Sequence, residues 1–202
     1  MKLILPLLGS ALLASGATAQ VVEREPTDRF ALQAMQNFGR CVVEQTPRGA
    51  REVLAQDYRA PGYSDALKAL AKGHSRCLPN GRLKFGGVLF AGSLAEALLR
   101  SEVGADKLPQ QLAFDPAREA ITARGEGETM ALCAVLKAPA ETATLLKTQA
   151  ASSEETAAIK SIAPKLGGCL AKGAKFEMNK PALRAMLALA AWRIVNSPRA
   201  AQ

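Results

Sequence analysis

Apolar residues recur along most of this chain at the three- and four-residue spacing that is typical of amphipathic helices. The clearest examples are residues 27–45, with Phe30, Ala34, Phe38, Cys41 and Val42 on one face, and residues 181–195, with Leu183, Met186, Leu187, Ala190 and Ile194 on one face. Strict alternation of apolar and polar residues, the pattern of a strand, occurs only near residues 83–85. The sequence therefore predicts an all-α fold.

Helix boundaries in the first half are indicated by prolines and small polar residues. Thr46 is suited to cap a second helix that begins at Pro47, because the first turn of a helix does not need the N–H that proline lacks. Ser64 is suited to cap a third helix that ends near Gly73. A fourth helix is expected at residues 88–103.

The second half follows the same order of helices. We expect one at residues 128–137, one from Pro139 onward, and one that begins at Ser152 or the serine after it. The spacing of Ser152 to Glu155 is that of a capping box. This third helix should end before Pro164, because proline disfavours helical geometry in the residue that precedes it.

Residues 41–100 and 133–193 share one skeleton of cysteines, prolines, glycines and aliphatic residues. The corresponding pairs include Cys41 with Cys133, Pro47 with Pro139, Leu54 with Leu146, Cys77 with Cys169 and Gly81 with Gly173, each 92 positions apart. This constant offset predicts that a unit of about four helices was duplicated and that the two units pack side by side. We assign residues 20–104 to the first unit, 105–127 to a connector with a short helix near 116–123, and 128–202 to the second unit.

The first nineteen residues have the order of a bacterial secretory signal peptide. Lys2 precedes an apolar run, and small residues follow up to Ala19, where we expect cleavage. The alternative, a membrane anchor, is disfavoured because Pro6 and Gly9 interrupt a run that is already short for a span. No later stretch is long and apolar enough to span a membrane, so we expect a periplasmic or secreted protein without a transmembrane segment after cleavage.

Four cysteines in an exported chain indicate disulfides. If each unit once folded alone, the pairs are Cys41–Cys77 and Cys133–Cys169, which are both 36 positions apart. The crossed pairs Cys41–Cys169 and Cys77–Cys133 are also symmetric and would indicate swapped units. We do not expect a metal site, because there is no Cys-x-x-Cys and His74 is the only histidine.

The chain is basic, with 26 Lys and Arg residues against 18 Asp and Glu residues and a net charge of +8. This balance favours a protein or an anionic envelope component as partner, whereas few aromatic residues and export argue against nucleic acid. The candidate anion-binding residues are Lys68, Lys72, Arg76, Arg82 and Lys84. The alternative interpretation of this strip is a solvated helix face.

No motif for catalysis or for a cofactor stands out, so we name no catalytic residue. His74 has no partner in a recognisable triad order, and Gly-x-Ser-x-Gly is absent. Glu96 and Arg100 are spaced for an ion pair within one helix. Trp192 is expected at the seam between the two units.

These observations favour an exported, non-enzymatic helical binding protein whose ligand lies in a groove between the units. Its plan of small helical units with internal disulfides resembles that of periplasmic inhibitors, immunity proteins and acid-stress chaperones. One alternative is therefore a stress protein that binds clients through apolar surface. The other is a hydrolase of envelope polymers in which two carboxylates meet only in space.

Overall fold

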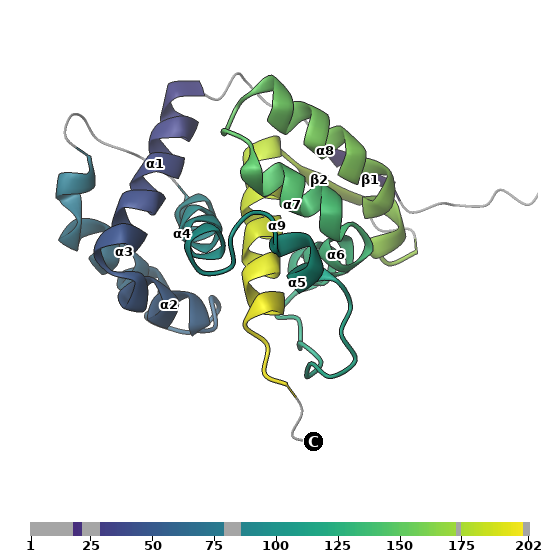
Figure 1. Cartoon of the computed structure of the whole chain (residues 1–202), viewed down its shortest axis with the longest axis horizontal. Helices are drawn as coiled ribbons and strands as arrows, with labels where there is room; N and C mark the ends of the chain where they lie inside the picture. The colour runs from purple at the N-terminus through teal and green to yellow at the C-terminus, as the bar shows by residue number, and fades with distance from the viewer. Residues whose placement is uncertain (1–17, 22–28, 79–85, 173–174, 200–202) are drawn as a thin grey trace, which may run out of the picture.

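The computed structural model describes residues 18–21, 29–78, 86–172 and 175–199 of the chain. These residues are mostly helical, as the apolar spacing predicts (Figure 1). The helices α1 to α4 lie on one side of the last helix, α9 (Lys180–Val195), and α5 to α8 lie on the other. Gly81, Gly173 and the alternating residues 83–85 lie in the segments 79–85 and 173–174, which are outside the described residues.

The helices of the two halves follow the same order, and α2 and α4 have the same lengths as α7 and α9. The first half contains α1 (Arg29–Gln45), α2 (Pro47–Ala55), α3 (Tyr63–Gly73), the 3-10 turn η1 (Ser75–Cys77) and α4 (Gly87–Glu102). The second half contains α6 (Glu126–Lys137), α7 (Pro139–Lys147), α8 (Ser153–Leu166), the 3-10 turn η2 (Gly167–Cys169) and α9. Both second helices begin at a proline, as expected.

Several helix boundaries differ from the prediction. Ser64 does not cap α3, because the helix already begins at Tyr63 after Gly62, which adopts a left-handed conformation. Pro164 lies inside α8, where the buried residues Ile162 and Leu166 hold the last turn against the core. At the other end of the same helix, the Ser152 side chain accepts a hydrogen bond from the Glu155 N–H, as the capping-box spacing predicts.

The connector is organised differently from the prediction. Its helix is α5 (Leu108–Leu112), which buries Leu108 and Leu112, while residues 116–123 form turns and irregular backbone. α6 begins at Glu126, within the segment assigned to the connector. The buried leucines explain the location of α5, since burial rather than spacing decides such a short helix.

Two short strands add to the helical fold. β1 (Thr18–Val21) pairs in parallel with β2 (Lys175–Met178). β1 contains both residues that flank the predicted cleavage point after Ala19. Parallel pairing joins segments that are distant in sequence, so the local pattern gives no sign of it.

The core is centred on the crossing of α4 and α9. α4 is apolar on almost every side and buries Phe90, Leu94 and Leu98 completely. Gly92 lies so close to Ala185 that a Cβ atom on Gly92 would come within 2.5 Å of the Ala185 Cα and Cβ atoms. Small residues at this point therefore allow the two backbones to approach each other.

Each half contains one disulfide, and the pairs are Cys41–Cys77 and Cys133–Cys169. The first joins α1 to η1, and the second joins α6 to η2. Such bonds form and persist in oxidising compartments, so the protein belongs outside the cytoplasm. Among the described residues, no single helix has the length and hydropathy of a membrane span, and α6 and α7 reach them only as a pair bent by 102°.

Candidate functional site

α4 contributes to two grooves, and each is lined from both halves of the chain. The polar groove lies between α1, α2, α4 and residues 147–149, with a volume of about 610 Å³. The seam groove lies between α3, α4, α6 and α9, with a volume of about 500 Å³. The chemistry of their walls differs, so each is considered in turn.

A buried ionic cluster lies next to the polar groove. Arg184 on α9 is only 6% exposed, and Glu96 on α4 and Glu155 on α8 are 5% and 4% exposed. Arg184 binds Glu96 in a bidentate manner, Nε to Oε2 at 2.9 Å and Nη2 to Oε1 at 2.7 Å. Its Nη1 donates to Glu155 Oε1 at 2.9 Å and to Thr148 Oγ1 at the same distance.

The surroundings keep this cluster charged. Burial alone lowers the pKa of Arg184, but Glu96 and Glu155 together raise it above its ordinary value. Gln36 on α1 donates to Glu96 Oε1 at 2.6 Å and accepts from the Ala150 N–H at 2.9 Å. The cluster therefore connects α1, α4, α8, α9 and the loop that follows α7.

The ion pair expected between Glu96 and Arg100 is present, at 3.2 Å. Arg100 also donates to the Leu146 carbonyl at 2.9 Å, so it ties α4 to the end of α7. Sequence reasoning missed Arg184 and Glu155. The available signal was a lone charge, Arg184, in the otherwise apolar stretch 181–191, opposite in sign to Glu96 in the apolar helix it packs against.

The carboxylates of this cluster are arranged for structural stability rather than for hydrolysis. Both oxygens of Glu96 accept hydrogen bonds from Arg184. Glu155 gives one oxygen to Arg184 and the other to the Ala151 N–H, at 2.7 Å. A general acid or nucleophile needs an oxygen directed at substrate. The hydrolase hypothesis therefore gains no support from Glu96 and Glu155.

The cations that line the polar groove have acidic neighbours. Arg51 lies 2.7 Å from Glu102, and Lys147 lies 3.3 Å from Asp106. Arg100 shares Glu96 with Arg184. These pairs reduce the attraction that the polar groove exerts on an anionic ligand.

The seam groove has a mainly apolar wall. Its aliphatic and aromatic lining includes Leu67, Val88, Ala91, Met186, Leu189 and Trp192. A second hollow of about 420 Å³, lined by residues 119–122 and 196–198, shares Leu54, Arg124, Trp192 and Arg193 with it. The shared lining makes the two hollows neighbours. Trp192 was expected at a seam between the units rather than in a ligand site, and it lines this groove together with Leu54 of the first half.

Charged residues occur at one part of the seam groove. Arg193 forms an ion pair with Glu128 and donates to the Thr122 carbonyl. The other Glu128 oxygen accepts from the Arg124 N–H at 2.6 Å. The Arg124 guanidinium donates to the Gln56 carbonyl at 2.8 Å, and no carboxylate of the described chain lies within 4 Å of it.

Two tyrosines line the seam groove near Arg124. Burial raises the pKa of Tyr63, and the positive charge of Arg124 opposes this rise. The Tyr58 side chain is partly exposed, and its hydroxyl lies 3.1 Å from the place that a Cβ on Gly125 would occupy. Arg124 thus combines a positive charge that pairs with no described carboxylate and an environment that is partly apolar and aromatic.

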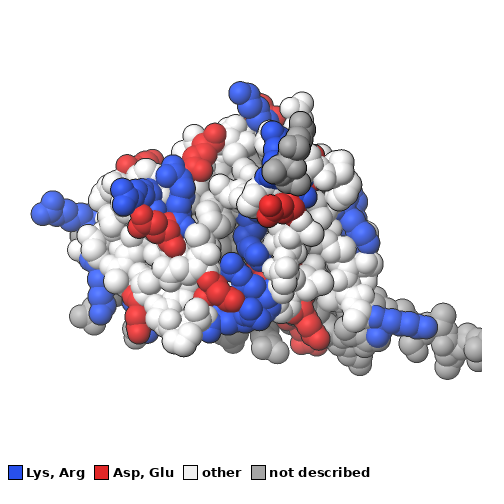
Figure 2. Space-filling model, turned by 90° about the horizontal axis from the view of Figure 1, so that it is seen from below, with Lys and Arg blue, Asp and Glu red and all other residues white. Residues whose placement is uncertain are grey.

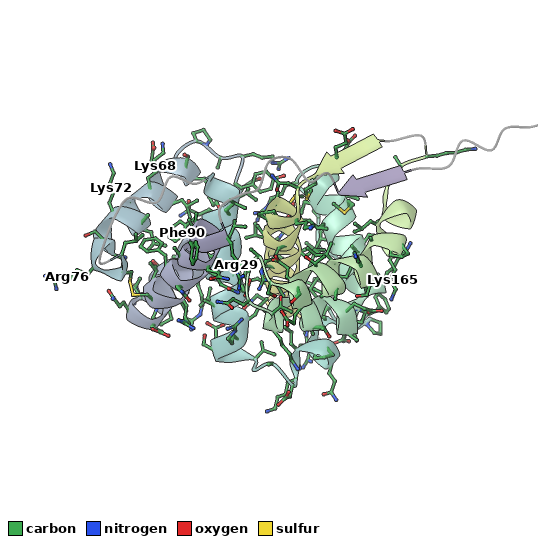
Figure 3. The ribbon with its side chains drawn as sticks, turned by 90° about the horizontal axis from the view of Figure 1, so that it is seen from above. Arg29, Lys68, Lys72, Arg76, Phe90 and Lys165 are labelled. Atoms are coloured by element: carbon green, nitrogen blue, oxygen red, sulfur yellow. A yellow bond between two sulfur atoms is a disulfide. The ribbon has the colours of Figure 1, made fainter. Side chains whose placement is uncertain are left out.

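The predicted anion-binding strip lies away from both grooves. Lys68, Lys72 and Arg76 point outward from α3 and η1 at the edge of the molecule (Figure 3). Lys68 forms an exposed ion pair with Asp65 at 3.2 Å. Arg82 and Lys84 lie outside the described residues, so the strip as a whole stays a prediction.

On the face drawn in Figure 2, a furrow separates two lobes, and basic and acidic side chains are interspersed around it. Within the described ranges, His, Cys, Asp and Glu side chains form no group of three or more that is suited to hold a metal ion.

No protein-family model, curated protein or solved structure matches this chain.

Proposed function

We propose that this protein is an exported, non-enzymatic binding protein that holds an apolar ligand in the seam groove. The observation that carries this proposal is the groove itself, whose apolar wall combines residues of both halves and includes the chain's single tryptophan. Ligand sites are characteristically concave and apolar, with a few polar groups that orient the ligand, and their volumes are roughly 300–1,000 Å³.

Export is supported by two features. The disulfides indicate maturation in an oxidising compartment. Residues 1–19 have the composition of a cleaved signal peptide, which would place the mature chain in the periplasm or the medium. The ligand would therefore be met in or outside the cell envelope.

The proposed duplication supplies a reason for the groove. α2 and α7 begin 92 positions apart, and both disulfides span 36 positions. Gly92 and Ala185, which meet where α4 crosses α9, occupy corresponding positions in the two helices, each five residues after the helix begins. A two-fold relation brings equivalent residues together at its axis. Two similar units that meet in this way leave grooves beside the crossing.

A neutral apolar dye tests the proposal. N-phenyl-1-naphthylamine should bind saturably, with one site per chain, and should quench Trp192 as it fills the groove. Val88 is 41% exposed on the groove wall and lies in the first turn of α4. A Val88→Glu change puts a carboxylate in the groove while it suits the positive end of the helix dipole. We expect this change to weaken dye binding at least tenfold.

Leu136 provides a matched control, since it is an aliphatic residue with 38% exposure that lines none of the grooves described above. Leu136→Glu should bind the dye as the unmodified protein does. Circular dichroism establishes that both variants keep their helical content. Equal dye binding by all three proteins would contradict the proposal.

A further inference from the structure

The inference rests on the binding function proposed above and concerns the chemical class of the ligand. We infer that the seam groove takes a free fatty acid, with its acyl chain along the apolar wall and its carboxylate at the Arg124 guanidinium. Three observations carry it: the second hollow that adjoins the groove, the aliphatic character of the groove wall, and the charges around Arg124.

The form of the groove favours a long, thin ligand. The seam groove of about 500 Å³ adjoins the hollow of about 420 Å³ at four shared lining residues, so a ligand that is longer than the first space can reach the second. Met186 and Leu189 on α9 line this space together with Leu67 and Val88 of the first half. Aliphatic side chains, with methionine among them, adapt to a flexible hydrocarbon chain.

The charges favour an anionic head group. Arg193 and Glu128 neutralise each other, and Glu128 also accepts a hydrogen bond from the backbone N–H of Arg124. Asp57, which acts electrostatically with Arg124, forms hydrogen bonds to Arg59 with both of its oxygens. The Arg124 guanidinium thus retains donors for a carboxylate, which it can bind in a bidentate manner.

One nearby charge opposes this arrangement and makes the inference easier to test. Glu126 is exposed on the first turn of α6 and also lines the groove. Its carboxylate repels an anionic head group but leaves a neutral one unaffected. Arg124 and Glu126 should therefore have opposite effects on the affinity for the same anionic ligand.

The experiment compares dodecanoate with dodecanol, below the concentrations at which either aggregates, by displacement of the neutral dye and by Trp192 fluorescence. We expect dodecanoate to bind about tenfold more tightly than dodecanol, because a charge-assisted hydrogen bond is stronger than a neutral one. Arg124→Gln should remove that advantage, and Glu126→Gln should increase it severalfold. Neither change should alter the affinity for dodecanol.

A chain-length series tests the acyl part of the inference. From octanoate to dodecanoate, each added methylene should tighten binding by up to about fourfold until the groove is filled. The control is Arg48→Gln, because Arg48 is an exposed arginine on α2 that lines none of the described grooves. This control should bind dodecanoate as the unmodified protein does.

The outcomes separate this inference from the proposed function. Equal binding of dodecanoate and dodecanol, or an unchanged Arg124→Gln variant, would overturn the fatty-acid assignment while dye binding still supported an apolar site. Displacement of the dye by an apolar peptide or by phosphatidylglycerol vesicles, but by neither dodecanoate nor dodecanol, would assign the groove to a different occupant. Absence of saturable dye binding would remove the proposed function itself.

Discussion

Arg184 connects charged and polar groups from both halves of the chain. Removing a guanidinium from water is costly, and the carboxylates of Glu96 and Glu155 offset that cost by accepting three charge-assisted hydrogen bonds from Arg184. The Thr148 carbonyl accepts a further hydrogen bond, at 2.8 Å. An apolar replacement would leave the buried Glu155 without the cation it pairs with and Glu96 with Arg100 alone.

We therefore expect Arg184→Met to lower the free energy of unfolding by about 3–5 kcal/mol, the range for removal of one partner from a buried ion pair. The measurement is urea unfolding followed by circular dichroism. Arg48→Met serves as the control, because the pair of Arg48 with Glu52 is exposed and its loss should leave the unfolding midpoint nearly unchanged. Similar midpoints for the two variants would show that the cluster does not stabilise the fold.

At this scale, the sequence reveals local pairs better than distant ones. The spacing of Glu96 and Arg100 within one helix is enough to predict their contact. Arg184 is 88 positions from Glu96, and nothing in local spacing brings them together. Arg124 was likewise missed as a candidate, because it lies in the glycine-rich connector and acquires its environment only from tertiary packing. The anion-binding strip on α3 was the local alternative that spacing offered.

Among the elements, α4 and α9 determine the arrangement of the rest. Both helices are largely buried, and their backbones approach most closely at Gly92 and Ala185. Gly39 on α1 is a second close approach, since a Cβ there would come within 2.3 Å of the Ser93 hydroxyl oxygen. α4 is thus held between α1 and α9 through small residues on two of its sides.

We expect Gly92→Ala to destabilise the protein by about 1–3 kcal/mol, because the new methyl group would force the two helices apart and disturb the packing. Thermal or urea unfolding measures this change. Gly73→Ala is the matched control, since a Cβ at Gly73 meets no atom within 4 Å, and its stability should be unchanged or slightly increased. A stable Gly92→Ala variant would mean that the crossing adapts readily.

Element identity followed from the sequence wherever a long apolar face or a proline start decided it. The helices at Pro47 and Pro139 and both disulfides were predicted correctly. Phe30 was placed on the buried face of the first helix, yet it is exposed in the first turn of α1. The prediction that a helix ends before Pro164 was wrong, and α5 and the paired strands were missed. Burial and long-range pairing override local preference at these places.

At the scale of the whole molecule, the halves are joined by both apolar and polar contacts. α4 and α9 pack across the middle of the molecule (Figure 1). The Glu96–Arg184 pair joins these two helices. Within the first half, Arg51 on α2 pairs with Glu102 at the end of α4 and so links α2 to the helix that packs against α9. An interface that contains much of the core couples the folding of the two sides.

We therefore expect a single cooperative unfolding transition rather than separate transitions for the two halves. Trp192, the chain's one tryptophan, lines the groove between the halves, so its fluorescence reports on that contact, whereas circular dichroism reports on the helices of both halves. Urea unfolding curves from the two probes should coincide, and their midpoints should shift together when a seam-groove ligand is added. A biphasic dichroism curve, with fluorescence following one phase alone, would mean that the halves fold independently. The α4–α9 crossing would then be a docking contact between two separate domains, and a ligand bound across the seam would stabilise their association instead of the fold of each.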